Sequence, residues 1–182
     1  IIRQGNDGGC YRLSFYNLSN GVINYINDFL ADYNYQNNPT YMSGKTISGI
    51  LGQNVVIGDL LYLDSGNKWY KTINNDITKS ANVMLGMAAE TGAINNSISI
   101  LLEGRVIVST ITALVKGGVM FIDSVTGGVT QTEPTTIGSI VRAIGVADQL
   151  ADTFYFNPDL SHRLIEPEYN TYIVSTDQTL SM

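Results

Sequence analysis

The sequence contains one short phrase twice, as LLYLDS at residues 60–65 and as VMFIDS at residues 119–124. Each copy has four apolar residues followed by Asp-Ser, and Asp64 and Asp123 lie 59 positions apart. A short apolar run closed by a turn-forming pair is typical of a strand that ends in a tight turn. The repetition predicts two related strands at equivalent places in the fold.

The surroundings of the phrase repeat with the same spacing. Gly58 and Gly117 precede the two strands at the same 59-residue interval, where a glycine would serve a bend or bulge. Gly86 and Gly145 follow them at that interval, within MLGMAA and AIGVAD. Because a repeat at fixed period marks a duplicated structural unit, the sequence predicts two tandem β units.

Turn signals such as SGN, ETG, KGG and TGG separate short apolar segments along most of the chain. Many short strands with such punctuation favour an all-β barrel or sandwich. The two units are expected at about residues 44–103 and 104–166, and their closure on each other would remove the sheet edges that each has alone. The expected strands are 46–50, 54–57, 60–63, 68–73, 82–89 and 97–102, then 105–109, 113–115, 119–122, 128–130, 139–147 and 153–156.

The first 43 residues differ in character from the rest. Apolar residues at helical spacing within residues 20–33 predict a short helix, followed by a linker around Pro39. A lone short amphipathic helix must bury its stripe, so we expect this stripe to contact a neighbouring subunit. Residues 167–182 are expected to form an extended tail. The predicted contact residues are Val22, Ile26, Phe29 and Tyr33.

Composition limits the classes of function. The chain has 182 residues, 44% of them hydrophobic and only 14% charged, with a formal net charge of −6. A low charge density with abundant Asn, Ser and Thr suits a protein that sits in a large assembly. An acidic chain without a basic stripe argues against nucleic-acid binding. No run reaches the roughly 18 apolar residues that a membrane helix needs, so no membrane partner is expected.

Catalytic chemistry is sparse in the sequence. His162 is the only histidine, and Cys10 is the only cysteine, and neither has the partners that a triad, a metal pair or a disulfide requires. Four carboxylates could pair as in a glycosidase or bind calcium, but they lack the DxDxDG spacing, and most lie at turn positions where Asp is expected for structural reasons. We therefore expect no catalytic residue, no cofactor and no metal site. The four carboxylates are Asp59, Asp64, Asp123 and Asp152.

The motif KWYK at residues 68–71 is the one candidate for surface recognition. Alternation along a strand places Trp69 on one face and Tyr70 on the other. One ring is expected in the core, and the other is a candidate for contact with a glycan or a neighbouring subunit. The sequence leaves open which ring takes which place.

The order of these motifs resembles the β-barrel modules of tailed-bacteriophage virion proteins. The pattern is Gly-x-hydrophobic-x-Tyr/Phe-hydrophobic-Asp-Ser, then hydrophobic-Gly-hydrophobic-Ala, and finally TFYFNPD at residues 153–159. The resemblance covers about residues 44–166 and includes capsid decoration proteins, head fibres and the distal domains of tail fibres. It implies a homotrimer or another symmetric oligomer, held on the virion surface by the major capsid protein or other virion proteins. It implies no enzymatic activity and no cofactor.

We therefore expect a non-enzymatic structural protein that decorates or projects from a phage capsid and assembles in the host cytoplasm. Three alternatives remain open. The first is a receptor-binding tail-fibre tip that recognises a host-surface glycan, and the second is a structural module of the tail or baseplate. A carbohydrate-active enzyme is the third.

Overall fold

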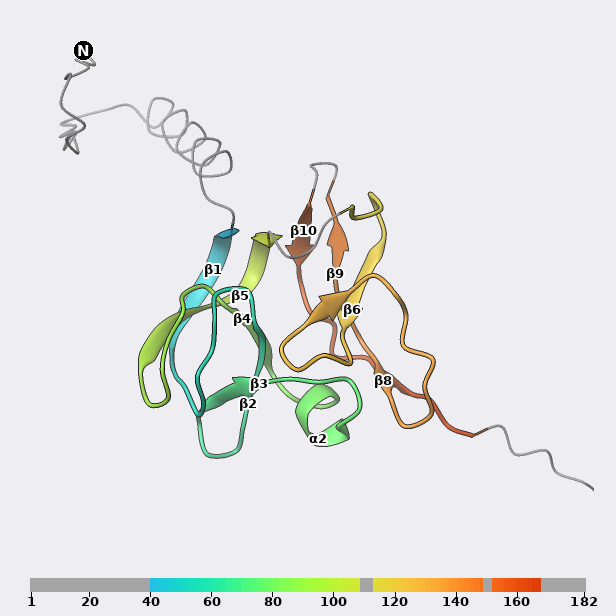
Figure 1. Ribbon diagram of the computed structural model, residues 1–182, viewed down its shortest axis with the longest axis horizontal. Coiled ribbons are helices and arrows are strands. Elements are labelled where there is room, and N and C mark those ends of the chain that lie inside the picture. Colours follow the sequence, from blue (N-terminus) through green and yellow to red (C-terminus); the bar gives the residue numbers. More distant parts are fainter. Residues whose placement is uncertain (1–39, 109–112, 149–151, 168–182) are drawn as a thin grey trace, which may run out of the picture. The chain divides into compact units, whose positions relative to one another are not determined.

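The computed structural model describes residues 40–108, 113–148 and 152–167 (Figure 1). The fold is mainly β: nine strands form one curled antiparallel sheet, a half-barrel, and two short strands form a second sheet. The one helix of the described residues has four residues. The elements are β1 (Thr40–Ile50), β2 (Leu60–Leu63), β3 (Trp69–Lys71), α2 (Ile77–Ser80), β4 (Leu85–Ala88), β5 (Ser97–Val108), β6 (Val119–Ile122), β7 (Val129–Thr130), β8 (Ile140–Val141), β9 (Ala143–Ala147), β10 (Thr153–Phe156) and β11 (Arg163–Leu164).

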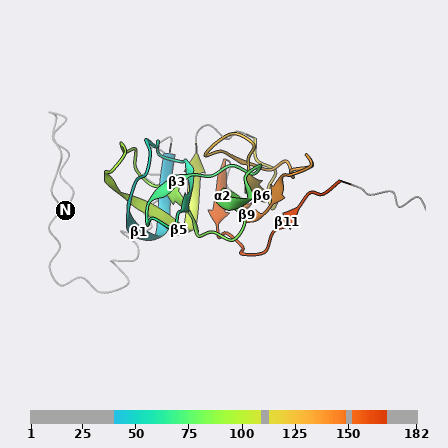
Figure 2. The ribbon, with the colours of Figure 1, turned by 90° about the horizontal axis from the view of Figure 1, so that it is seen from below.

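The strand β5 joins the two parts of the large sheet. The strand order is β3-β2-β4-β5-β10-β9-β6-β7, and β1 pairs along β5 as well. β4 pairs with β5 at Ile100 and Leu101, whereas β10 pairs with the later stretch from Gly104 to Ile107. The strands β2, β3 and β4 form one group on one side of β5, and β6, β7, β9 and β10 form the other group. Figures 1 and 2 show the two groups side by side, with α2 at their junction.

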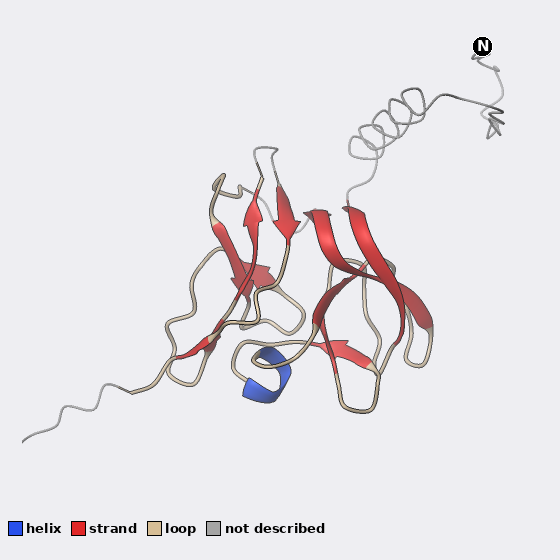
Figure 3. Ribbon diagram, turned by 180° about the vertical axis from the view of Figure 1, so that it is seen from behind, coloured by secondary structure: helices blue, strands red, loops and turns tan. Residues whose placement is uncertain are grey.

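The position at which the sequence predicted a junction between units, 103/104, lies inside β5. The predicted strands 97–102 and 105–109 fall, as far as the structure describes them, in one continuous strand that runs to Val108 and pairs with β1 (Figure 3). β1 begins at Thr40, within the stretch that the sequence assigned to the linker, because its backbone pairs with β5 from Thr40 onward.

The two copies of the repeated phrase make equivalent backbone contacts. Leu60 pairs with Met87, and 59 residues later Val119 pairs with Val146. The equivalence extends to the turn before each strand. The N–H of Gly58 donates to the carbonyl of Ala88 at 2.8 Å, and the N–H of Gly117 donates to that of Ala147 at 3.0 Å. We call β2, β3, β4 and the first half of β5 the first repeat, and β6, β7, β9 and β10 the second repeat.

The repeated glycines before β2 and β6 occupy a conformation that favours glycine. Gly58 has φ +94° and Gly117 has φ +74°, in the region where a Cβ atom is unfavourable. Both residues lie in the turn that leads into a strand, which is the bend that the sequence predicted for them.

Several predicted strands have the predicted bounds, and others are absent. Residues 60–63, 119–122 and 153–156 are strands as expected. Residues 54–57 and 113–115 are not strands. The Oδ2 atom of Asp59 accepts the N–H of Val56 at 2.7 Å, which turns the first segment into a loop. Ala113 has φ +60°, which is incompatible with an extended strand.

Buried side chains form two clusters. One lies within the first repeat and contains Leu51, Val55, Leu61, Trp69, Ala88, Ile98 and Ile100. The other joins both repeats and contains Leu60, Leu85, Met87, Leu101 and Val106 together with Met120, Ile122, Ile144, Phe154 and Phe156. Because side chains alternate along a strand, β2, β4 and the first half of β5 contribute buried residues to both clusters.

The end of β1 meets β3. Leu51 forms a parallel bridge with Trp69, and the N–H of Gly52 donates to the carbonyl of Trp69 at 2.8 Å.

Within the described residues, no helix has the length and apolar character needed to span a bilayer. The predicted helix with Val22, Ile26, Phe29 and Tyr33, together with Cys10 and the tail after residue 167, lies outside the described residues.

Candidate functional site

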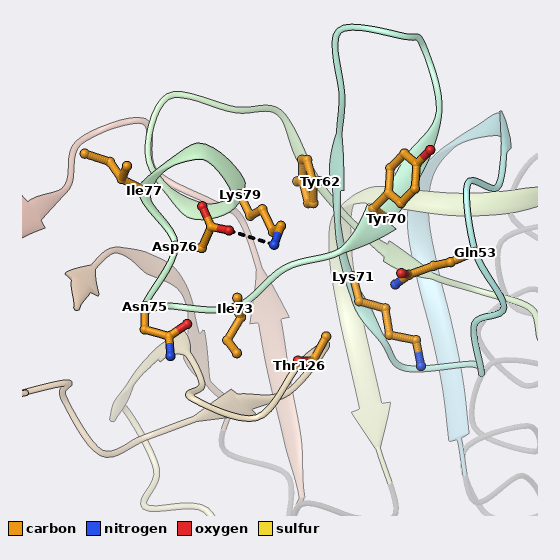
Figure 4. A pocket seen from close by; sticks show the side chains of 10 residues that line it. All are labelled: Gln53, Tyr62, Tyr70, Lys71, Ile73, Asn75, Asp76, Ile77, Lys79 and Thr126. Atoms are coloured by element: carbon orange, nitrogen blue, oxygen red, sulfur yellow. Dashed lines mark ion pairs between the residues drawn. The ribbon is translucent and has the colours of Figure 1, made fainter. Parts of the chain in front are cut away.

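A surface pocket of about 550 Å³ lies beside the β2–β3 hairpin. Its walls come from that hairpin, from the segment that runs through α2, and from the turn before β7 (Figure 4). The first repeat and the second repeat therefore both contribute to it. The lining residues are Gln53, Tyr62, Tyr70, Lys71, Ile73, Asn75, Asp76, Ile77, Lys79 and Thr126.

Two tyrosines form the aromatic part of the pocket. Tyr62 and Tyr70 are direct cross-strand partners in the β2–β3 hairpin, so their side chains emerge on the same face. Their ring centroids are 6.0 Å apart, with the ring planes inclined by 30°. Burial of the ring is the main cause of a raised pKa of Tyr62, although the nearby Lys79 lowers it.

The structure resolves the two roles within the KWYK motif. Trp69 is 2% exposed and packs in the core of the first repeat, whereas the next residue, Tyr70, lines the pocket. The candidate glycan contact at Trp69 is therefore corrected: its ring is core, because strand alternation turns it inward. Tyr70 is the ring of this motif that a ligand can reach.

The helix α2 supplies charge to the pocket. Asp76 caps the helix, and its Oδ1 atom accepts the N–H of Thr78 at 3.0 Å and the hydroxyl of Thr78 at 2.6 Å. Its other oxygen is 2.6 Å from the ammonium of Lys79. Figure 4 shows this ion pair beside the Tyr62 ring. The hydrogen bond from Lys79, followed by that from Thr78, lowers the pKa of Asp76, and the same contact with Asp76 raises the pKa of Lys79.

A buried arginine fixes the end of α2. Arg142 is 1% exposed, and its Nη1 atom donates to the carbonyls of Ser80, Ala81 and Val83. Its Nε atom donates to the carbonyl of Asp159. The guanidinium thereby ties the segment after α2 to the segment after β10. Burial lowers the pKa of Arg142, and the charge of Asp159 opposes that effect.

The wall opposite α2 is polar as well. The ammonium of Lys71 is 2.8 Å from Asp59, whose side chain is 12% exposed. Gln53 on this wall, and Asn75 beside Asp76 on the α2 side, add amide groups that both donate and accept hydrogen bonds. Two aromatic rings beside several amide and charged groups can hold a ligand that has both apolar faces and hydroxyl groups.

The aspartates that the sequence assigned to turns accept backbone hydrogen bonds in those turns. Asp64 accepts the N–H of Lys68 at 2.8 Å, and Asp123 accepts that of Val125 at 3.3 Å. These bonds confirm the predicted turn role of the Asp-Ser pairs.

The other singled-out polar residues also take part in local contacts. Asp152 accepts the N–H of Ala113 at 2.9 Å. The ring of His162 lies 3.4 Å from the carbonyl of Leu160. Among the residues that the structure describes, no three His, Cys, Asp or Glu side chains gather as metal ligands would.

Sequence reasoning missed most of the pocket. Tyr62 was assigned only to a repeated strand, although the hairpin register around SGN places it opposite Tyr70. The Asp76-x-Thr78 pair is a recognisable helix start that was passed over. Nothing in the sequence points to Arg142, because its partners are backbone carbonyls from distant segments.

The sequence matches no protein-family model, and a search of curated proteins finds no relative.

Proposed function

We propose that this chain is a non-enzymatic structural protein of a bacteriophage virion, decorating or projecting from the capsid surface. The observation that carries the proposal is the use of its carboxylates. Asp59, Asp64, Asp76, Asp123 and Asp152 each accept a backbone N–H of a nearby turn, cap or loop. Aspartate carboxylates act as catalytic groups in many enzymes, but in this chain these five stabilise turns, a helix cap and loops. This use supports a role as a rigid structural protein.

The resemblance of the strand and turn motifs to phage β-barrel modules gives the proposal its setting. In this proposal the two repeats are tandem copies of one ancestral unit, fused through β5 into a barrel-like body. The chain forms a homotrimer or another symmetric oligomer. In this proposal the residues before β1 attach it to the major capsid protein or other virion proteins, with Val22, Ile26, Phe29 and Tyr33 in the contact.

Localisation is the direct test. An antibody against the chain, imaged by electron microscopy on purified virions of the encoding phage, is expected to label regularly spaced sites on the head. Label on the tail or baseplate instead would favour the alternative of a tail or baseplate module. Virions without label would overturn the proposal. Sedimentation of the purified chain is expected to give an oligomer, and a monomer at high concentration would count against self-assembly.

A receptor-binding tail-fibre tip is a second candidate, favoured by the tyrosine pocket. Sugars bind proteins by stacking their C–H faces on aromatic rings while amides and carboxylates bond their hydroxyl groups. Tyr62 and Tyr70, with Gln53, Asn75 and Asp76 around them, provide this combination.

A glycan array separates this candidate from the first. A receptor binder would retain specific glycans, and Tyr70→Ala would abolish their binding. Tyr155→Ala is the matched control, because Tyr155 is 47% exposed and lies outside the pocket. Loss of binding in both variants, or no binding by the natural chain, would reject the tyrosine pocket as a receptor site. Cleavage of a bound glycan would instead support the carbohydrate-active enzyme.

A further inference from the structure

The tyrosine pocket contains polar side chains that the fold does not use. Gln53, Tyr62 and Tyr70 are half-buried, and Asn75 lies at the α2 side of the same pocket (Figure 4). Within the described residues, none of these four side chains has a hydrogen bond. The turn aspartates, by contrast, accept backbone N–H groups. The pocket therefore has hydrogen-bonding groups that are available to a ligand.

The chemistry of these groups favours a ligand with hydroxyl groups. Amides and tyrosine hydroxyls both donate and accept hydrogen bonds. A sugar hydroxyl does the same, so it can bond to each of them in either direction. A phosphate or a carboxylate only accepts, and it would leave the acceptor oxygens of Gln53 and Asn75 without a donor.

The charges of the pocket are paired with each other. The ammonium of Lys79 is 2.6 Å from Asp76, and the ammonium of Lys71 is 2.8 Å from Asp59. Each lysine therefore has its own carboxylate, which an acidic ligand would have to displace. The negative charge of such a ligand would also lie close to both carboxylates, and like charges in contact are unfavourable. The pocket therefore favours a ligand without charge.

The two tyrosines give the pocket an apolar surface. Tyr62 and Tyr70 are cross-strand partners on one face of the hairpin, with ring centroids 6.0 Å apart and ring planes inclined by 30°. Neighbours of this kind lie side by side, so they present one aromatic surface. The C–H face of a pyranose ring can pack on such a surface while its hydroxyl groups reach the amides around it.

Gly52 determines where the Tyr70 ring lies. A Cβ atom at position 52 would be 2.0 Å from Cζ of Tyr70 and 2.3 Å from its Cε1 atom. The ring therefore occupies the space that a side chain at this position would need. The N–H of Gly52 donates to the carbonyl of Trp69 at 2.8 Å, which holds the backbone beneath the ring. The ring thus has a defined place before a ligand arrives.

We propose that the tyrosine pocket binds an uncharged pyranose of a neutral glycan, and that Gly52 is a positioning residue for the Tyr70 ring. The inference rests on the receptor-binding candidate function and narrows its ligand to one chemical class. The cavity of about 550 Å³ lies within the range of about 300–1,000 Å³ that is usual for small-ligand sites.

The first test compares matched glycans on an array probed with the full chain. Each pair ends either in a hexose or in the corresponding hexuronic acid, which differs only by a carboxylate in place of the CH₂OH group. The natural chain is expected to bind the neutral member of a pair at least tenfold more tightly. Its affinity for that member is expected to be the same at low and high salt, because no ion pair with the ligand is screened.

The second test moves the Tyr70 ring without changing its chemistry. Gly52→Ala is expected to weaken binding of the neutral glycan at least tenfold while the circular dichroism spectrum stays that of the natural chain. Gly66→Ala is the matched control in the turn between β2 and β3. Its new Cβ atom would be 3.2 Å from the Oδ2 atom of Asp64 and would not contact the ring. The control is expected to bind as the natural chain does.

A further variant tests the pocket if Gly52→Ala does not fold. Gln53→Leu removes an amide at similar size, and it is expected to weaken binding of the neutral glycan at least fivefold. Unchanged binding by Gln53→Leu would overturn the assignment of the pocket. Unchanged binding by a folded Gly52→Ala variant, or equal loss in Gly66→Ala, would overturn the positioning role of Gly52.

The outcomes separate this inference from the functions proposed above. Equal or tighter binding of the hexuronic acid members, abolished by Tyr70→Ala, would overturn the uncharged ligand and leave the receptor-binding candidate intact. A natural chain that binds no glycan would overturn both. Neither result bears on the structural role, which antibody labelling of virions tests by itself.

Discussion

Arg142 is the residue whose environment is least expected for its type. It is the one charged side chain among the described residues that is fully buried, and its Nε and Nη1 atoms donate to backbone carbonyls rather than to a carboxylate. A buried charge is costly unless hydrogen bonds compensate it. Its value to the fold lies in joining the loop after α2 to the loop after β10, which fixes one wall of the tyrosine pocket.

Replacing this arginine tests that role. Arg142→Met keeps much of the apolar stem but leaves the carbonyls of Ser80, Ala81, Val83 and Asp159 without their donor. We expect the free energy of unfolding to fall by about 3 kcal/mol or more, measured by urea denaturation. Arg163→Met is the control, because Arg163 is exposed in its ion pair with Glu133, and it should cost less than about 1 kcal/mol. Similar losses in both variants would contradict the prediction.

Two glycines of the repeat are expected to respond differently to substitution. A Cβ atom on Gly145 would lie 2.2 Å from the carbonyl oxygen of Tyr155, within the β9–β10 pair, so Gly145→Ala must push two strands apart. We expect a loss of about 3 kcal/mol in unfolding free energy. Gly117→Ala meets nothing within 4 Å and suffers only from its positive φ, which costs about 1 kcal/mol. Thermal unfolding followed by circular dichroism would compare them, and an equal cost would refute the steric argument.

At the scale of elements, α2 shows how a four-residue helix is held in place. Isolated helices this short are unstable in water. In α2, Asp76 caps the first turn and Arg142 donates to the carbonyls of Ser80 and Ala81 at the end, so hydrogen bonds at both ends stabilise the helix. The N-terminal cap is sensitive to protonation, since Asp76 acts as an acceptor for Thr78 and Lys79.

The pH dependence of stability follows from this cap. The pKa of Asp76 is lowered below its ordinary 3.8 in the folded chain, so its contribution is fully present above that pH. The contribution is lost as the pH falls through the lower folded value. We expect Asp76→Asn to flatten the acid side of a plot of stability against pH, below the ordinary pKa of 3.8, relative to the natural chain. An unchanged slope in acid denaturation monitored by circular dichroism would show that the cap does not contribute.

At the scale of the whole molecule, the two repeats form one cooperative body. They share β5 and a cluster of buried side chains to which both contribute. Neither repeat keeps its full core without the other, because Leu60 and Met87 of the first belong to the same buried cluster as Phe154 and Phe156 of the second. Unfolding of one repeat should therefore unfold the other.

The single tryptophan allows this coupling to be measured. Trp69 lies in the core of the first repeat, so its fluorescence reports on that repeat. Phe154→Ala removes a fully buried ring from the second repeat and is expected to cost about 4 kcal/mol. We expect the tryptophan transition in urea to shift with the circular dichroism transition. A tryptophan transition left at its natural midpoint would show that the repeats unfold independently.

The sequence by itself determined the local features of this protein. The 59-residue period, the strands at residues 60–63, 119–122 and 153–156, and the turn role of Asp64 and Asp123 follow from alternation and turn chemistry. These features depend on neighbours a few residues away, which is why they can be recognised without coordinates. The mainly β fold followed from the same signals.

Only the tertiary structure decided how the repeats are joined and where chemistry gathers. The continuity of β5, the inward place of Trp69, the pairing of Tyr62 with Tyr70 and the contacts of Arg142 depend on segments far apart in the chain. The equivalence of two repeats also hid a difference. Matching residues on the same face are buried in one repeat and exposed in the other, because burial depends on what covers a strand and not on the strand's own sequence.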